Sequence, residues 1–176
     1  MLFNSYMSKK IIITGGLGYI GTELCKLYSG VSWHHKIKVI DNRFISERVN
    51  QIRNWNMDFI QGNILDKDFI NKHFKDADVV HHLAGITSVP RTKSESSAEK
   101  DKEITTVGVE GTKNILDAIS EKCKIIFPST HVVYEGIDKV KTDIKESDET
   151  KPILSYSLSK AINEKQLKDS GKNYVI

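Results

Sequence analysis

The feature that most constrains the fold is a glycine-rich turn at residues 14–21. It follows the β-branched run Lys10–Thr14, typical of a strand buried on both faces, and it precedes Tyr19–Tyr28, where apolar residues recur at helical spacing. Its glycines fit G-x-G-x-x-G from Gly16 and G-x-x-G-x-x-G from Gly15. This order brings backbone N–H groups and a helix N-terminus to a pyrophosphate. An ordinary tight turn is the alternative, and the glycines alone do not decide between the two.

A carboxylate stands where a dinucleotide site requires one. Asp41 ends the second expected strand, twenty positions after Gly21, where an acidic residue accepts hydrogen bonds from an adenosine ribose. This context favours a dinucleotide site over an empty turn. A carboxylate repels a 2′-phosphate, so Asp41 favours NAD over NADP, although the nearby Arg43 leaves NADP open.

Short apolar strands and amphipathic helices alternate along the chain. We expect further strands at residues 36–40, 57–60, 77–82, 124–128 and 174–176, and helices from Asp66 through Phe74, at 107–120 and at 155–170. Repeated β-α-β units predict an α/β fold with a doubly wound parallel sheet, the Rossmann fold. Two charged segments, residues 87–102 and 135–151, are expected as surface loops beside the ligand crevice.

Length and charge set the broad class. The 176 residues fit a single domain, which we divide into an N-terminal extension, residues 1–8, and an NAD(P)-binding Rossmann domain, residues 9–176. A net charge of +3, scattered along the chain, argues against nucleic acid as a partner, and no apolar run approaches the roughly 18 residues of a membrane span. Two cysteines without a CxxC pair, and no signal peptide, indicate a cytoplasmic protein without a disulfide scaffold or metal site.

A tyrosine and a lysine point to acid–base chemistry. Tyr156 and Lys160 stand four residues apart and so share one face of an expected helix. An ammonium group favours the phenolate, so Lys160 could lower the pKa of Tyr156 and make it a general base or acid for a substrate hydroxyl. Such a pair is usually a surface pair. A catalytic role is favoured here because the same chain carries the dinucleotide pattern. It is also favoured because Ser129 and Thr130 follow a strand, where a hydroxyl could hydrogen-bond the same substrate oxygen.

Seven segments, taken in order, resemble the extended short-chain dehydrogenases/reductases, the NAD-dependent epimerase/dehydratase family typified by UDP-glucose 4-epimerase. The segments are residues 14–21, Asp41, residues 62–66, residues 81–85, Gly111 with Thr112, residues 129–134 and residues 156–160. Each motif is weak alone, and the order of all seven makes the resemblance specific. It covers the chain from Lys9 onward.

The resemblance implies a role for individual residues. Thr130, Tyr156 and Lys160 would form the catalytic triad, and Lys160 would also hold the nicotinamide ribose. Asn63 and Ile64 would flank the adenine. The complete set of expected cofactor-binding residues is Gly15, Gly18, Tyr19, Ile20, Gly21, Asp41, Asn42, Asn63, Ile64, Leu83, Ala84, Gly85, Ser129, Tyr156 and Lys160.

The resemblance also implies an activity, an NAD-dependent nucleotide-sugar epimerisation, most simply at C4 through a keto intermediate. The substrate would be a UDP-linked sugar, and the full-length enzyme a homodimer. The alternatives are an NAD(P)-dependent reductase or dehydrogenase of the same family and a non-catalytic NAD-binding module. Family members are much longer, so we expect the C-terminal substrate-binding region to be missing from this chain.

Three departures from the family pattern bear on function. Asn63 replaces the usual aspartate but still offers a hydrogen bond to adenine. Gly108 replaces an asparagine, which removes an amide from the helix before Gly111. His131 and Val132 stand where sugar dehydratases carry an Asp-Glu pair, so the sequence predicts no dehydration.

Overall fold

The computed structural model describes residues 7–87, 92–137 and 141–176. Its strands are β1 (Lys10–Thr14), β2 (Lys36–Asp41), β3 (Asp58–Gln61), β4 (Val79–His82), β5 (Lys124–Ile126) and β6 (Asn173–Val175). Its α-helices are α1 (Tyr19–Tyr28), α2 (Ser46–Asn54), α3 (Lys67–Phe74), α4 (Ala98–Thr105), α5 (Gly111–Ala118) and α6 (Ser155–Asp169). Short helical turns are η1 (Lys93–Glu95), the π-helical η2 (Thr106–Glu110) and η3 (His131–Tyr134).

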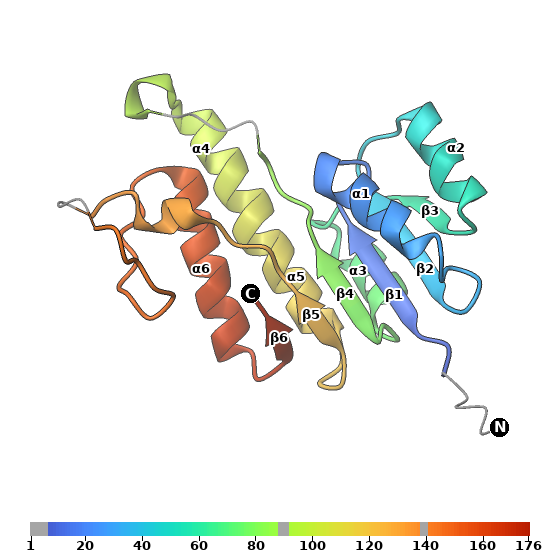
Figure 1. The fold of residues 1–176 in the computed structure, drawn as a ribbon. Coiled ribbons are helices and arrows are strands. Elements are labelled where there is room, and N and C mark those ends of the chain that lie inside the picture. Colours follow the sequence, from blue (N-terminus) through green and yellow to red (C-terminus); the bar gives the residue numbers. More distant parts are fainter. Residues whose placement is uncertain (1–6, 88–91, 138–140) are drawn as a thin grey trace.

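The strands form one parallel sheet in the order β3-β2-β1-β4-β5-β6 (Figure 1). The chain runs outward from β1 to β3 and then returns to β4 on the other side of β1. The loops that follow β1 and β4 therefore diverge, and they leave a crevice at the carboxyl ends of these strands. The doubly wound sheet predicted from the sequence is confirmed.

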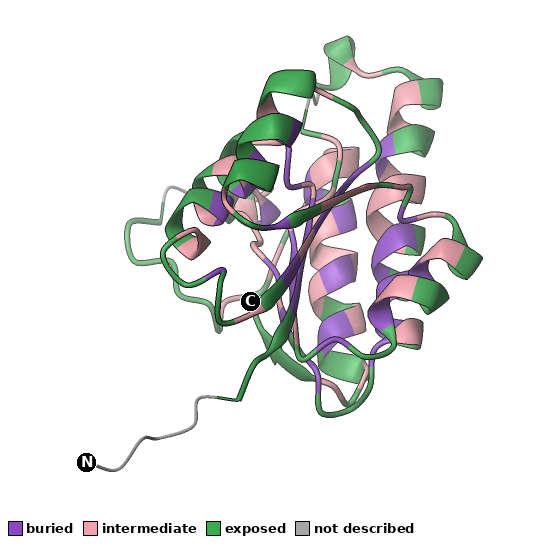
Figure 2. Ribbon diagram, turned by 90° about the vertical axis from the view of Figure 1, so that its right-hand side faces the viewer, coloured by how far each residue is buried: buried purple, intermediate pink, exposed green. Residues whose placement is uncertain are grey.

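Two apolar cores hold the helices to the sheet. Side chains alternate along β1, so Ile12 packs in the core beneath α3, α5 and α6, while Ile11 and Ile13 pack in the core beneath α1 and α2. Figure 2 shows the buried residues gathered along the strands and on the inward sides of the helices. Phe74 and Phe127 are the bulkiest fully buried side chains in the described residues. β1, β2 and β4, whose ends border the crevice, are the strands that are mostly buried.

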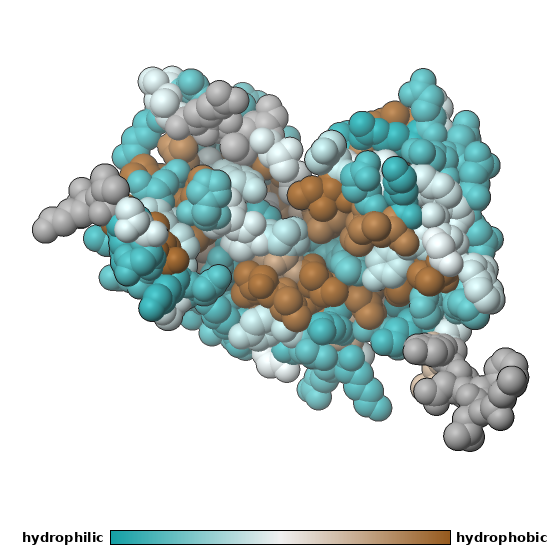
Figure 3. Space-filling model, viewed as in Figure 1, coloured by the Kyte–Doolittle hydropathy of each residue, from teal (hydrophilic) through white to brown (hydrophobic). Residues whose placement is uncertain are grey.

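Part of the sheet is open to solvent. In the described residues, no helix lies over β5 and β6 on the side that faces the viewer in Figure 1, and Figure 3 shows apolar side chains across this face. Leu27 on α1, together with Val175 and Ile176 at the end of the chain, contributes exposed apolar surface. No helix in the described residues has the length and apolar character that a membrane crossing requires.

The helix boundaries correct two predictions. Residues 87–102 are not a loop throughout, because α4 begins at Ala98, after the Ser97 side chain accepts a hydrogen bond from the Lys100 backbone. The helix expected at 107–120 is the later part of a longer helix that begins with α4. The short helix α2 was not predicted, whereas the Asp66 cap of α3 is confirmed.

Some predicted segments extend beyond what the structure describes. In the expected N-terminal extension, residues 1–6 lie outside the described residues. The same holds for residues 88–91 of the first expected loop and residues 138–140 of the second. The division of the chain at residues 8 and 9 stays a prediction.

Candidate active site

A cavity of about 1030 Å³ opens at the carboxyl ends of the strands, around the point where the strand order reverses. Figure 3 shows a notch in the surface there, between α4 and the half of the molecule that holds α1 and α2. All fifteen expected cofactor-binding residues line this cavity. They are Gly15, Gly18, Tyr19, Ile20, Gly21, Asp41, Asn42, Asn63, Ile64, Leu83, Ala84, Gly85, Ser129, Tyr156 and Lys160. The fold thus brings these separate segments to one site.

The turn between β1 and α1 has no room for a side chain at three of its glycines. Gly15 has φ +67°, and a Cβ on it would lie 2.8 Å from the Ala84 nitrogen. A Cβ on Gly16 would collide with the Val39 side chain, and one on Gly21 would lie 2.7 Å from Gly16 Cα. Gly18 differs, because its φ is −74° and a Cβ there would meet only the Gly15 carbonyl oxygen, at 3.1 Å. Gly18 is therefore the least crowded glycine of this turn.

The Asp41 carboxylate joins the end of β2 to this turn. Its Oδ2 accepts a hydrogen bond from the Leu17 backbone at 3.0 Å, and Oδ1 accepts one from the Arg43 backbone at 3.0 Å. The Arg43 guanidinium also donates to both oxygens, at 3.0 and 3.1 Å, and these bonds raise its pKa. The Asp41 side chain is only 3% exposed, and the Arg43 guanidinium contacts both of its oxygens.

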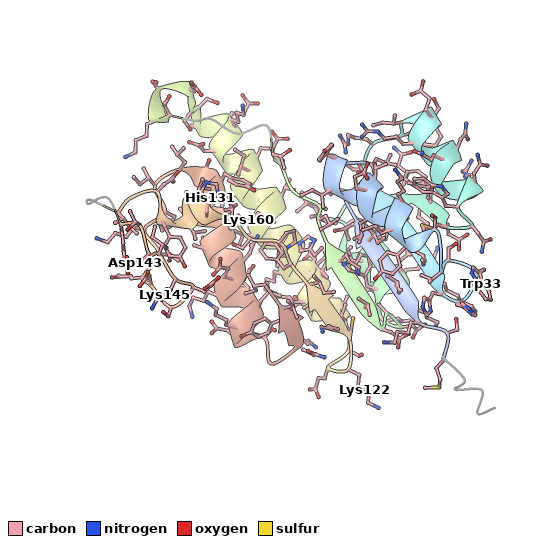
Figure 4. The ribbon with its side chains drawn as sticks, in the orientation of Figure 1. Trp33, Lys122, His131, Asp143, Lys145 and Lys160 are labelled. Atoms are coloured by element: carbon pink, nitrogen blue, oxygen red, sulfur yellow. The ribbon has the colours of Figure 1, made fainter. Side chains whose placement is uncertain are left out.

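Lys160 lies on α6 at the inner end of the cavity (Figure 4). Its Nζ donates to the Pro128 carbonyl oxygen at 2.9 Å and lies 4.2 Å from the centre of the Phe127 ring. Burial lowers the pKa of Lys160 to about 8, because the charged form has lost most of its water. The ammonium group is thus held in place by a carbonyl and an aromatic face.

The expected effect of Lys160 on Tyr156 is corrected by the structure. Burial raises the pKa of Tyr156. Lys160 Nζ lies 5.9 Å from the centre of the Tyr156 ring and donates its hydrogen bond to the Pro128 carbonyl oxygen instead. In this conformation the tyrosine therefore keeps its proton, and only a closer ammonium would favour the phenolate.

The structure also separates the two hydroxyls that follow β5. Ser129 lines the cavity, and its Oγ donates to Glu164 Oε1 at 2.5 Å. Thr130 does not line the cavity, because its Oγ1 accepts from the Val132 backbone at 3.4 Å and caps η3. The expectation that Thr130 joins Tyr156 at the site is therefore not met in this structure.

Sequence reasoning missed the wall that α4 and η2 supply. The cavity residues on this wall are Glu99, Lys102, Glu103, Thr106 and Val107. Of these, Glu99 and Lys102 fall in the charged segment 87–102, which we expected to be a loop. A helix signal was present in the Ser97 cap and in Ile104, the buried residue of α4. This wall gives the cavity two carboxylates and an ammonium group that the motifs did not reveal.

One turn of π-helix, η2, interrupts the helix between α4 and α5. Its Gly108 carbonyl accepts from Thr112 Oγ1 at 2.7 Å and, with the amide oriented toward it, from Asn163 at 3.2 Å. A Cβ on Gly108 would lie 3.1 Å from Ser159 Oγ. Ser159 and Asn163 belong to α6, so the glycine lets the two helices approach. This contact accounts for the glycine where the resemblance expects asparagine.

Three comparisons with known proteins show the family and the fold. The sequence matches the model of the 3-beta hydroxysteroid dehydrogenase/isomerase family over residues 12–175. A UDP-N-acetyl-alpha-D-glucosaminuronate decarboxylase of Bacillus cytotoxicus is 35% identical over 130 residues, which make up 73% of this chain and 38% of that protein.

Two solved structures share the fold. A UDP-N-acetylglucosamine 4-epimerase from Methanobrevibacter ruminantium, in complex with UDP-N-acetylmuramic acid, is 29% identical with a TM-score of 0.75, over 95% of this chain and 53% of that chain. A UDP-glucuronic acid 4-epimerase from Bacillus cereus, in complex with UDP-glucuronic acid and NAD, is 26% identical with a TM-score of 0.74, over 95% of this chain and 55% of that chain. This chain spans about half the length of these enzymes, and 38% of the decarboxylase.

Proposed function

Since the chain belongs to the extended short-chain dehydrogenases/reductases, in the NAD-dependent epimerase/dehydratase family, we propose that it binds NAD and carries the acid–base residues of a nucleotide-sugar 4-epimerase. The observation that carries the proposal is the cavity itself. It places the glycine turn, the Asp41 carboxylate and the Tyr156–Lys160 pair around one space. Bound UDP-sugars in both solved relatives support a UDP-linked substrate.

The residues at the turn fit a dinucleotide. Gly18 leaves open the space that a Cβ would fill, and the first turn of α1, with Tyr19 and Ile20, lines the cavity. The N–H groups of a first helical turn have no partner within the helix, so they are free to bind phosphate oxygens. Asp41 would accept the adenosine ribose hydroxyls, and Asn63 would lie beside the adenine.

Bound NAD would supply reversible hydride transfer to and from the sugar carbon. Tyr156 would take the proton of the sugar hydroxyl at Oη and later return it. Because burial raises the pKa of Tyr156, it needs a cation close by to act as a base. Lys160, mostly protonated at neutral pH, would supply that charge once it leaves the Pro128 carbonyl for the cofactor ribose and the tyrosine.

Calorimetric titration tests the cofactor part. We expect NAD to bind more tightly than NADP, because the Asp41 carboxylate repels a 2′-phosphate. Asp41→Asn keeps the side-chain shape and removes the charge, so it should narrow the difference in affinity between NAD and NADP. Arg43→Ala serves as the comparison, since it should weaken NADP binding and keep the preference for NAD. Equal affinity of the unchanged chain for both cofactors would refute the assignment.

Product analysis tests the chemistry. In a protein that also carries the substrate-binding region expected for the family, we expect UDP-glucose to be converted to UDP-galactose without net formation of NADH, and Tyr156→Phe to lower kcat about 10²–10⁴-fold while NAD affinity is kept. Turnover that survives Tyr156→Phe would contradict the role of Tyr156. Stoichiometric NADH formation from a sugar substrate would identify a dehydrogenase, and NAD binding without conversion a cofactor-binding module.

A further inference from the structure

Two adjacent histidines at the end of β4 point into different cores. His81 Nε2 lies 2.8 Å from the Tyr28 hydroxyl of α1. His82 lies on the other face of the sheet, where it is 1% exposed and its ring centre lies 5.6 Å from that of Phe127. The alternation of strand side chains explains this division. His82 plays no part in the function proposed above.

Both ring nitrogens of His82 contact a threonine hydroxyl. Nδ1 lies 3.0 Å from Thr14 Oγ1, at the end of β1, and Nε2 lies 2.9 Å from Thr112 Oγ1, on α5. Each hydroxyl has one proton to donate. The other partners of the two threonines therefore fix the direction of every hydrogen bond.

The donor and acceptor of each hydrogen bond follow from the Thr112 end of the series. The Thr112 hydroxyl donates its proton to the Gly108 carbonyl oxygen at 2.7 Å, so it can only accept from His82. His82 must therefore carry its proton on Nε2, and Nδ1 accepts the Thr14 proton. The Thr14 oxygen is then free to accept from the Leu83 and Ala84 backbone N–H groups, at 3.1 and 3.0 Å. Every donor and acceptor in the series is satisfied by one tautomer.

The surroundings oppose a charge on this ring. Thr14, Thr112 and the Phe127 ring are neutral, and among the described residues the ionised group that acts on the ring is the Lys160 ammonium. Burial and that positive charge lower the pKa of His82 to about 3. A neutral ring is the form that the hydrogen bonds require.

The series of bonds reaches three walls of the cavity. Leu83 and Ala84 line one wall, and η2, through Thr106 and Val107, lines another. Thr14 precedes the glycine turn, where Gly15 lies so near the Ala84 backbone that an added Cβ would collide with it. A shift of the ring would move these walls relative to one another.

We propose that His82 is a positioning residue, a neutral imidazole protonated on Nε2 that holds the glycine turn, the Leu83–Ala84 backbone and the π turn in register around the cavity. Its effect on cofactor affinity rests on the proposed function. The arrangement of the bonds does not, so the two can be tested separately.

Nitrogen-15 NMR of labelled histidine tests the tautomer without any ligand. We expect the Nε2–H form of His82 to persist unchanged between about pH 5 and pH 9, whereas an ordinary histidine titrates in that range. An Nδ1–H form, or titration of His82 within this range, would overturn the proposal. In Thr112→Val the Nε2 proton loses its acceptor, and we expect it to exchange faster with water.

Matched variants test the positioning. His82→Gln should remove the hydrogen-exchange protection of the Leu83 and Ala84 amides and weaken NAD binding about tenfold or more, since it leaves buried groups unpaired. His81→Gln is the control on the same strand. It should lower stability through Tyr28 yet keep both the protection and, within about twofold, the affinity.

The outcomes separate the two proposals. If the unchanged chain fails to bind NAD, the proposed function falls, and amide protection alone decides the role of His82. If His82→Gln does not fold, Thr112→Val gives the same comparison, because it breaks only the far end of the series. Equal effects of His81→Gln and His82→Gln on the two amides would refute the positioning role.

Discussion

The glycine turn allows packing and ligand binding to be separated by two single substitutions. Gly21→Ala adds a methyl group between α1 and the turn. Its Cβ would lie 2.7 Å from Gly16 Cα, which is 0.7 Å short of the 3.4 Å of ordinary contact, and it would also meet the Gly15 carbonyl oxygen. Both neighbours are backbone, so the start of α1 itself must move.

The magnitude follows from opposing effects. Overpacking of this kind costs about 1–3 kcal/mol. Alanine returns up to about 1 kcal/mol through its higher helix propensity. Because the clashing neighbours are backbone atoms, we expect the upper part of the first range, about 2–3 kcal/mol. With the alanine gain subtracted, the net loss is about 1–2 kcal/mol, which corresponds to a fall in Tm of roughly 2–8 °C for a chain of this size.

Gly18→Ala is the matched variant. Its backbone φ of −74° suits any residue, and the added Cβ meets only the Gly15 oxygen, at 3.1 Å. Replacing glycine by alanine at an N-cap should cost less than about 1 kcal/mol. The methyl group would, however, occupy the space proposed for the diphosphate, so NAD affinity should fall about tenfold or more.

Thermal unfolding followed by circular dichroism, without ligand, measures the first effect, and calorimetry with NAD measures the second. The reasoning predicts that Gly21→Ala loses mainly stability and Gly18→Ala mainly affinity. It would be refuted by an unchanged Tm in Gly21→Ala, or by a Gly18→Ala protein that binds NAD as tightly as the unchanged chain.

Two further predictions rest on buried groups. The pKa of Lys160, about 8 in the folded chain and about 10.4 when unfolded, means that this group binds more protons in the unfolded state between these values, so it contributes a rise of stability with pH across this window, at up to about 1.4 kcal/mol per pH unit. The buried thiols of Cys25 and Cys123 act in the opposite direction above about pH 9, because their pKa values are raised on folding. Denaturant unfolding should therefore show the Lys160 contribution as a steeper pH dependence of the unchanged chain than of Lys160→Met, and equal slopes would contradict it. Burial raises the pKa of Cys25 to about 12 and that of Cys123 to about 11; neither thiol should therefore react with a thiol reagent at neutral pH until the chain unfolds, and rapid reaction of the native protein would contradict their burial.

The sequence predicted best where the apolar pattern is dense. The β-branched run Lys10–Thr14 predicted a strand, and the structure buries four of its five residues. Helix α2 buries only Val49 and Ile52, and α4 buries only Ile104, so the periodic signal was too sparse to identify either. Tertiary contacts, rather than pattern, decide such short charged helices.

At the site, residue types were easier to predict than side-chain directions. The strand before Ser129 and Thr130 was predicted, although β5 ends at Ile126 rather than at Pro128. Which of the two hydroxyls faces the cavity depends on the turn into η3. The sign of the Tyr156 pKa shift depends on burial depth and on the position of Lys160, neither of which spacing along a helix reveals. The direct contact of Arg43 with Asp41 was likewise not visible from their separation of two residues.

The π turn gives the helix a place that can gain or lose one residue. Five residues of a π turn cover about the same angle as four residues of an α-helix, which turn the chain by about 100° each. Deleting one residue from η2 would therefore restore a continuous α-helix and keep Glu99, Lys102 and Glu103 on the cavity wall. A deletion between Glu103 and η2 would instead rotate these three residues by about 100° relative to α5. Among homologous chains, a change of length there would alter which charges meet the ligand, while the loss of one residue within η2 would leave that wall unchanged.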